Sequence, residues 1–361
     1  MSLGRPLHVM VPGPIGQATG GYGYLRRAVA GLRARGETVV VHELPGSYPV
    51  PDDTARTGAD RALAQVPDAA LVLTDGLALP MAANALWVER HRLRLVALVH
   101  HPLHLETGLT PVQAALLRQL ERVALSKMRR VVVPSRATAA DVVALDVPAG
   151  RIGIVPPGTD PAPPAQGSAD GVPTLLTVAT LTPRKGHGVL LEALASLATL
   201  PWRAVLAGSD DRDPAEAARL RATVARLGLG DRVTLTGEVT ADRLEALWHG
   251  ADLFVLPSFH EGYGMAAAEA LARGLPVVAS RAGALPDLVP EAAGGLVPPG
   301  DAAALAAALR PLLADAQARA RAAAAARAAG AALPDWPATA AALAAELAYA
   351  LPQDRRIERI A

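Results

Sequence analysis

The sequence predicts an α/β protein built from two doubly wound parallel sheets. Short runs of Val, Leu and Ala alternate with helical patterns along the chain, and a stretch rich in Pro, Gly and Ser at 156–173 divides this alternation into two halves. A strand covered on both faces is apolar throughout, because neither face meets water. The length of 361 residues also fits two domains.

The first half contains six apolar runs. Leu7–Val11 precedes a glycine-rich loop, and a helical pattern then continues until Gly36 stops it. Further strands are expected at Thr38–His42, Ala69–Thr74, Leu93–Val99, Arg129–Pro134 and Arg151–Val155. Helical segments between most of these runs predict a first domain over residues 1–157.

The alternation restarts after an expected linker at 158–173. Strands are expected at Thr174–Thr180, Arg203–Gly208, Arg232–Gly237, Asp252–Pro257, Pro276–Ser280 and Gly294–Pro298. These runs predict a second domain over 174–334. The alanine-rich tail is predicted to be helical, with a break at Pro334 and Pro337 before a last helix.

Composition excludes several classes of protein. A formal net charge of +1 gives no electrostatic case for nucleic acid, and the absence of cysteine removes disulfides and thiolate metal sites. No apolar run is long enough to predict a transmembrane segment. We expect a cytoplasmic protein. Contact with the inner face of the membrane is an alternative for the arginines of the first helix, although a solvated helix face is favoured there.

Candidate ligand-binding residues follow the strands, because such sheets bind ligands beyond their carboxyl ends. His100 directly follows the fourth strand and is expected to point into a cleft; Pro102 disfavours a metal site built with His104. The loop after the first strand lacks a G-x-G-x-x-G pattern, which weakens a nicotinamide site. Gly20 and Gly21 there allow either close approach to a phosphate or a mobile surface loop.

Two charged segments follow strands of the second half. Arg184 and Lys185 lie in a strand-to-helix turn and suit a diphosphate, although such a turn alone is more often a solvated basic surface. Asp211 and Asp213 have the spacing of a cation site. Because Pro214 begins a helix at once, an N-cap and first-turn charges are the favoured interpretation.

The segment Ser258–Ser280 predicts one strand–helix–strand unit with two carboxylates, Glu261 and Glu269. Glu261 lies in the loop at the carboxyl edge of the sheet. Glu269 lies about one turn into the helix, whose side chains lean toward its amino end, so both carboxylates can reach one cleft. Carboxylates at such a place suit hydrogen bonds from the hydroxyl groups of a sugar and a ribose.

These segments resemble the retaining nucleotide-sugar glycosyltransferases of family 4, which have the GT-B fold of two Rossmann-like domains facing a central cleft. Glu261 and Glu269 meet the E-x7-E signature in EGYGMAAAEALARGLPVVAS. The turn LTPRKG, the stretch GEVTADRLEALWHGADLFVLPS, the loop and helix GGYGYLRRAVAGLRARGETVVV, and LVHH also match. The resemblance spans nearly the whole chain and is strongest from Thr174 to Pro298.

The resemblance implies a role for each matching residue. Glu261 would contact the donor sugar at the reaction centre, and His100 would position that sugar. Lys185 with Arg184 would stabilise the leaving diphosphate, and Glu269 would hold the ribose. The implied donor set also includes Gly262, Tyr263, Gly264, Met265, Thr180 and, near the base, Gly237, Glu238 and Val239. Gly20 and Gly21 would approach phosphates or the acceptor.

The resemblance implies transfer of a hexose from a nucleotide-diphosphate sugar, without metal or other cofactor, to an acceptor that the sequence does not identify. A small molecule or glycan is favoured over a lipid. The first domain would be the acceptor side, the second would bind the donor, and a last helix at 338–361 would cross back onto the first. Thr180 stands where the family often has arginine. A degenerate sugar-nucleotide-binding protein, or an epimerase or hydrolase on the same fold, therefore stays an alternative.

Overall fold

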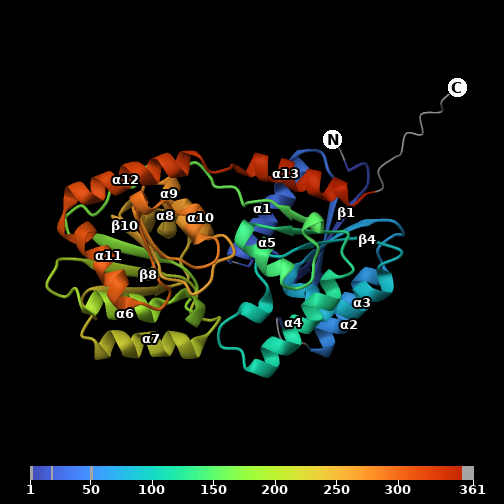
Figure 1. Cartoon of the computed structure of the whole chain (residues 1–361), viewed down its shortest axis with the longest axis horizontal. Coiled ribbons are helices and arrows are strands. Elements are labelled where there is room, and N and C mark those ends of the chain that lie inside the picture. Colours follow the sequence, from blue (N-terminus) through green and yellow to red (C-terminus); the bar gives the residue numbers. More distant parts are fainter. Residues whose placement is uncertain (1–2, 18, 49–51, 352–361) are drawn as a thin grey trace. The chain divides into compact units, whose positions relative to one another are not determined.

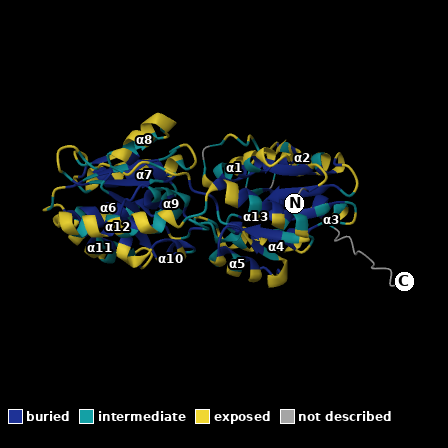
Figure 2. Cartoon of the chain, turned by 90° about the horizontal axis from the view of Figure 1, so that it is seen from above, coloured by how far each residue is buried: buried dark blue, intermediate teal, exposed yellow. Residues whose placement is uncertain are grey.

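The computed structural model describes residues 3–17, 19–48 and 52–351. The chain forms two compact units, one of Met1–Gly158 together with the segment from Trp336 onward, and one of Thr159–Asp335 (Figure 1). In both units the sheet is buried, and the covering helices carry the exposed residues on their outer sides (Figure 2). Among the described residues, no helix is both long and apolar enough to span a bilayer.

The first unit contains a parallel sheet with the order β2-β1-β3-β4-β5-β6. Its strands are β1 (Leu7–Pro12), β2 (Val39–Leu44), β3 (Leu71–Asp75), β4 (Arg94–Leu98), β5 (Arg130–Val133) and β6 (Ile152–Ile154). The apolar side chains of β3 and β4 are buried because helices cover both faces of the sheet. The expected strands of this half are confirmed to within two residues.

Helices cover the two faces of the first sheet. They are α1 (Gly20–Ala34), α2 (Asp53–Ala64), α3 (Leu79–Glu89), α4 (Pro111–Leu125), α5 (Arg136–Val143) and α13 (Trp336–Tyr349). One core joins the sheet to α2, α3 and α4. On the other face α13 packs against α1 and β5, so the last helix returns to the first unit. The part of the expected last helix beyond 351 lies outside the described residues.

The second unit repeats this architecture with the order β12-β11-β10-β7-β8-β9. Its strands are β7 (Thr174–Val178), β8 (Arg203–Ala207), β9 (Val233–Gly237), β10 (Leu253–Leu256), β11 (Val277–Ser280) and β12 (Gly294–Val297). Strands β7 and β10 pair in parallel at the centre, with Leu176 opposite Phe254. Successive strands are added outward from β7 on one side and from β10 on the other, so the strand order reverses between these two.

Helices also cover both faces of the second sheet. They are α6 (His187–Ala195), α7 (Pro214–Arg226), α8 (Ala241–His249), α9 (Met265–Ala272), α10 (Leu285–Leu288), α11 (Ala302–Ala314) and α12 (Ala316–Ala331). Residues of α6, α7 and α11 form the core on one face, and residues of α8, α9 and α12 form the core on the other. The alanine-rich tail is therefore folded into packed helices, as expected.

The segment 159–173, which composition suggests is a linker, is hydrogen-bonded to the second unit. Its backbone amides donate to Pro334 O, Arg273 O, His249 O and the Asp252 carboxylate over distances of 2.8–3.2 Å. These bonds explain why proline- and glycine-rich residues hold a defined path without belonging to a helix or strand. The segment is accordingly part of the second unit rather than a free connection.

Candidate functional site

Lys185 and Glu261 meet at the place where the strand order of the second sheet reverses. Lys185 ends the 3₁₀ turn η4 (Pro183–Lys185) after β7, and Glu261 lies in the loop after β10. The Lys185 Nζ atom lies 2.6 Å from Glu261 Oε1. The two residues are 76 positions apart in sequence, and the pairing of β7 with β10 brings them together. A reversal of strand order is where doubly wound sheets bind ligands.

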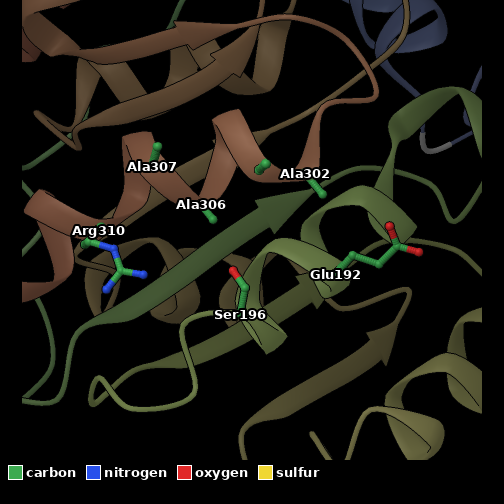
Figure 3. Close-up of a pocket in the computed structure, with 7 residues that line it drawn as sticks. Glu192, Ser196, Ala302, Ala306, Ala307 and Arg310 are labelled. Carbon is green, nitrogen blue, oxygen red and sulfur yellow. The ribbon is translucent and has the colours of Figure 1, made fainter.

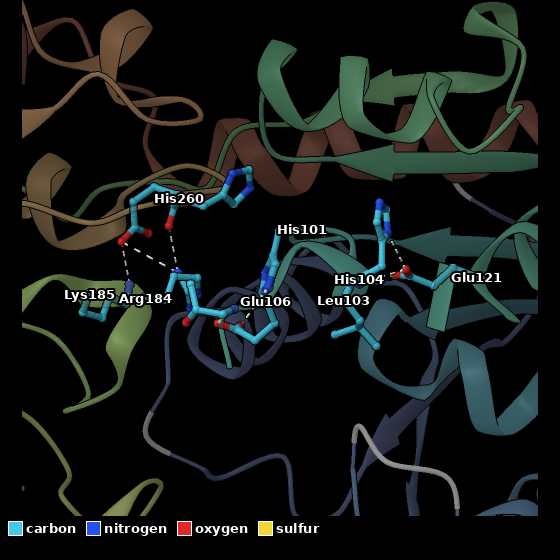
Figure 4. A network of polar contacts seen from close by, with 10 residues as sticks. His101, Leu103, His104, Glu106, Glu121, Arg184, Lys185 and His260 are labelled. Carbon is cyan, nitrogen blue, oxygen red and sulfur yellow. Dashed lines mark hydrogen bonds and ion pairs between the residues drawn. The ribbon is translucent and has the colours of Figure 1, made fainter. Parts of the chain in front are cut away.

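Arg184 is held beside this pair. Its guanidinium donates a hydrogen bond of 2.9 Å to His260 O and lies 4.0 Å from Glu261 Oε1 (Figure 4). Its backbone carbonyl accepts a bond of 2.8 Å from Phe259 N, so the two loops are connected through backbone and side chain. Gly186 ends the turn in a left-handed conformation, where an added Cβ would lie 2.1 Å from Pro257 O. Only glycine lets the two loops approach this closely.

Glu261 is a buried carboxylate that the site keeps ionised. Burial opposes its charge, but Lys185, Arg184 and hydrogen bonds from Lys185 and Ser258 outweigh burial, and the net pKa is lowered. The Ser258 hydroxyl donates to Oε1 over 2.7 Å. The contacts of Lys185, Arg184 and Ser258 all fall on Oε1. The site therefore combines an oriented negative charge with two cations that are only partly exposed.

The glycine-rich turn after Glu261 leads directly into α9. Gly264 is the N-cap in a left-handed conformation and has no side-chain cap bond. The first amides of α9 are thus uncapped by a side chain, which suits an anion. Tyr263 is partly buried, and burial raises the pKa of its hydroxyl to about 12. Gly262 and Met265 are also partly buried beside it.

Glu269 lies on α9 in a different environment. Its carboxylate makes no hydrogen bond to any other part of the chain that the structure describes. Burial raises its pKa to about 7; Arg273 opposes the rise, while Glu245 and Asp160 add to it. Arg273 is engaged elsewhere, because it donates to Glu245 over 2.6 Å and to the Glu269 backbone carbonyl. The Glu269 carboxylate therefore keeps hydrogen-bond acceptor capacity that no described residue uses.

Thr180 follows β7 at the position where the family often has arginine. Its carbonyl lies 3.1 Å from His187 Nε2. His187 is completely buried at the start of α6, and burial lowers its pKa to about 4, so the ring is neutral. His187 thus holds the backbone of Thr180, while Arg184 places a guanidinium beside Glu261.

Gly237, Glu238 and Val239 stand at the end of β9, the edge strand of the second sheet. They lie at the carboxyl edge of the sheet, as expected, and strand β8 separates them from β7 and the turn that carries Lys185.

The Asp213 carboxylate accepts a bond of 2.9 Å from Glu216 N and is the N-cap of α7. This confirms the capping interpretation of Asp213.

In the first unit, His100 follows β4 and pairs with an acid that the sequence analysis did not select. His100 Nε2 lies 3.2 Å from Asp75 Oδ2, and Asp75 ends the neighbouring strand β3. The Tyr24 ring meets the His100 ring edge-on at 5.5 Å between centroids. A Cβ added at Gly21 would lie 3.1 Å from the His100 ring, and Gly20 begins α1 beside it. The glycine loop and His100 therefore lie together.

The other histidines near His100 have carboxylate partners of their own. His101 Nε2 lies 3.2 Å from Glu106, and His104 Nδ1 lies 3.0 Å from the buried Glu121 (Figure 4). Glu121 also accepts from Leu103 N over 2.6 Å. Across the described ranges, no group of three or more His, Cys, Asp or Glu side chains is placed to hold a metal.

A surface pocket of about 370 Å³ lies between α6 and α11 (Figure 3). Glu192, Ser196 and Arg310 line it together with alanines of α11. None of the residues predicted from the sequence lines it. The pocket lacks the converging polar groups of a reactive site, so the strand ends are the better candidate for the functional site.

The structure adds partners that sequence reasoning missed. Ser258 and Asp75 stand at or just after strand ends, so the strand-end rule could have selected them. Arg273 and His187 carried no such signal, because they lie at the ends of helices and resemble ordinary helix residues. Their roles depend on the residues that they contact in the folded chain, Glu245 for Arg273 and Thr180 for His187.

Solved structures define the class of fold. Sucrose-phosphate synthase from Thermosynechococcus elongatus is 24% identical with a TM-score of 0.79, and the match covers 94% of this chain and 97% of that chain. Anabaena HepE, solved in complex with UDP and glucose, is 22% identical with a TM-score of 0.74, covering 94% and 98%. Two Rossmann-like sheets arranged in this order have the GT-B fold, which confirms the predicted fold class.

The sequence then places the chain within that class. Residues 159–329 match the family described as Glycosyl transferases group 1, and residues 21–163 match the family described as Glycosyltransferase Family 4. Together these matches run through both units. The chain therefore belongs to glycosyltransferase family 4, as the E-x7-E signature predicts.

Curated relatives match a shorter stretch. D-inositol 3-phosphate glycosyltransferase of Corynebacterium efficiens is 32% identical over 188 residues, which are 50% of this chain and 44% of the relative. D-inositol 3-phosphate glycosyltransferase 2 of Catenulispora acidiphila is 35% identical over 216 residues, 54% of this chain and 50% of the relative. The matched part thus spans about half the length of these relatives.

Proposed function

We propose that this protein transfers a hexose from a nucleotide-diphosphate sugar to an acceptor, with retention of anomeric configuration and without a metal ion. The contact between Lys185 and Glu261 where the strand order reverses carries the proposal. It places a cation for a leaving phosphate beside a carboxylate for a sugar. Family membership supports the reaction class, and the UDP bound by HepE supports a uridine donor.

Lys185 and Arg184 would stabilise the diphosphate leaving group. Negative charge grows on that group as its bond to the sugar breaks, so fixed cations lower the barrier. The uncapped amides at the start of α9 would add to this stabilisation. Arg184 would supply the charge that the family often places at Thr180, because its guanidinium reaches to 4.0 Å from Glu261.

Glu261 would act on the transferred sugar. Its lowered pKa keeps it ionised, so it can accept a sugar hydroxyl bond and stabilise the positive charge that develops at the anomeric carbon. An ammonium group carries three donors, so Lys185 can hold Glu261 and contact a phosphate oxygen together. The leaving phosphate would then take the acceptor's proton on the same face of the sugar, which is how retention arises in this family.

Glu269 would hold the ribose hydroxyls, because its carboxylate has acceptor capacity that no described residue uses. Thr180 and the turn Gly262–Met265 would line the donor, and the Gly237–Val239 backbone would lie near the base. The second unit would thus be the donor side. In the first unit, Asp75 would orient His100 to position the sugar, with Gly20 and Gly21 beside it on the acceptor side.

Release of nucleoside diphosphate from a panel of nucleotide sugars tests the proposal, first with water as acceptor and then with small polyols and sugar phosphates. Turnover should persist in EDTA and fall about a hundredfold or more in Lys185→Ala. Lys127→Ala is the matched control, because Lys127 and Lys185 are the two lysines of the sequence. A rate that collapses in EDTA and returns with manganese would contradict the metal-free assignment and direct attention to Asp211 and Asp213.

Thr180 favours a second candidate, a sugar-nucleotide-binding protein without turnover. In that case thermal shift would report tight binding of one donor, while neither water nor any acceptor would release nucleoside diphosphate. Restoring the family's arginine with Thr180→Arg would then be expected to raise donor affinity or to produce turnover. If Thr180→Arg only disrupts binding, Arg184 already occupies the phosphate position and the degenerate alternative loses its basis.

A further inference from the structure

Exposed apolar side chains gather on two adjacent helices of the first unit. Ten large apolar residues are exposed among those the structure describes, and five of them are on α3 and α4, which pack together. These five are Trp87, Val88, Val112, Leu116 and Val123, and they define the α3–α4 surface. Single exposed apolar residues are common, but a group of this kind marks an interaction surface.

Helix α4 is apolar on two sides. Its inner side carries Leu117, Ala124 and Leu125, which are buried in the core. Val112, Leu116 and Val123 follow the helical repeat along another side, and they are 78%, 49% and 39% exposed. The core therefore does not account for this second apolar stripe.

The charges on the same surface are mostly positive. Arg118 and Arg122 are exposed on α4, whereas the one carboxylate of that helix, Glu121, is buried and bonded to His104. Arg118 donates to Ala144 O, and Arg122 pairs with Asp146, which is itself exposed. A basic helix with an apolar stripe and no exposed acid of its own is complementary to an anionic interface.

Trp87 lies on α3, contacts Lys127 just beyond the end of α4, and is 48% exposed. Lys127 Nζ lies 3.9 Å from the centroid of its ring, and the Arg90 guanidinium lies 4.2 Å from it. An exposed tryptophan with cations against its ring suits the polar–apolar boundary of a bilayer. There the ring can insert while the cations meet phosphate groups.

We propose that the α3–α4 surface attaches the protein peripherally to an anionic lipid bilayer. A second copy of the chain is a poorer occupant, because a two-fold interface would bring this basic surface against an identical basic surface. Lipid fits both halves of the surface: acyl chains accept Val112, Leu116 and Trp87, and anionic headgroups neutralise the basic residues. The attachment is independent of the proposed reaction.

Vesicle sedimentation tests the attachment. The full chain should bind vesicles of equal phosphatidylglycerol and phosphatidylcholine more tightly than phosphatidylcholine alone. Leu116→Ser should weaken that binding about tenfold through lost apolar burial, and Lys127→Gln about fivefold through lost charge. Val112→Ser is a second variant whose highly exposed side chain contributes little to folding. Val40→Ser, an exposed apolar residue on β2, is the control and should bind as the parent does.

Tryptophan fluorescence gives an independent measurement. Trp202, Trp248 and Trp336 are buried, so Trp87 is the exposed one of the chain's four tryptophans. Anionic vesicles should shift the emission to shorter wavelength, and Trp87→Phe should abolish that shift. Vesicle binding that is unchanged in Leu116→Ser and Val112→Ser but is lost in high salt would overturn the proposal. So would a lack of vesicle binding, or a dimer in light scattering that Leu116→Ser dissociates.

Discussion

Glu269 is a predicted donor-binding residue whose charge should destabilise the fold. Its pKa is raised from an ordinary 4.5 to about 7, chiefly by burial. The folded protein therefore retains a proton that the unfolded chain releases as pH rises above 4.5. Stability should fall as pH rises through the window from 4.5 to about 7, because the unfolded state binds fewer protons there. Glu269→Gln removes this charge and should remove its pH dependence.

The difference between the folded and unfolded pKa values sets the size of the effect. A tenfold change in an acid dissociation constant corresponds to about 1.4 kcal/mol, so the rise from 4.5 to about 7 gives an upper limit of about 3 kcal/mol. Glu269 is only partly buried, and solvent screening reduces that figure. We therefore expect Glu269→Gln to be about 1–2 kcal/mol more stable than the parent at about pH 8, with almost no advantage at about pH 4.5. The same variant should raise the donor KM, because an amide offers one acceptor oxygen where a carboxylate offers two.

Urea unfolding at several pH values measures the first effect, followed through the emission of Trp202 and Trp248, which both lie in the second unit. Glu192→Gln, on the exposed side of α6, is the matched control for removal of a glutamate charge from this unit. Donor affinity of the parent should rise with pH through about 7 as Glu269 ionises, and the variant should lack this rise. A stability difference that is constant with pH, or a variant less stable than the parent in mild alkali, would refute the reasoning.

Lys185→Met should destabilise the protein by about 3 kcal/mol, because it leaves Glu261 buried without its main cation; the double variant with Glu261→Gln should recover most of the stability in urea unfolding but none of the turnover. A double variant as unstable as the single one would rule out this ion-pair account. Burial lowers the pKa of His187 from 6.5 to about 4, so stability that is fully present above pH 6.5 should decline toward pH 4; thermal unfolding of His187→Phe should show a smaller decline. Arg232 stacks 3.7 Å over Trp202 and donates to three backbone carbonyls, so Arg232→Ala should cost about 2 kcal/mol in urea unfolding. Arg232→Lys should recover only part of this, since lysine lacks the planar fork; full recovery would show that charge alone matters.

The sequence alone determined the strands, the repeated architecture and the family. Buried parallel strands are continuous apolar runs, so their positions depend on local composition and were predicted to within two residues. The strand-end rule selected Lys185, Glu261 and His100 for the same reason: a residue just after a strand reaches the ligand-binding edge whatever the rest of the chain does. The E-x7-E spacing is likewise local, because both carboxylates belong to one turn and helix.

Only the tertiary structure decided which residues act on one another. Lys185 meets Glu261 because β7 pairs with β10, and Asp75 meets His100 because β3 pairs with β4. Composition marked 158–173 as a linker, yet backbone hydrogen bonds from residue 159 onward hold this segment to the second unit. Nothing in the sequence indicated that Glu261 would be kept ionised while Glu269 would hold its proton near neutral pH. Two carboxylates in one motif have the same intrinsic chemistry. Their pKa values diverge because burial and neighbouring charges, which come from distant parts of the chain, differ at the two places.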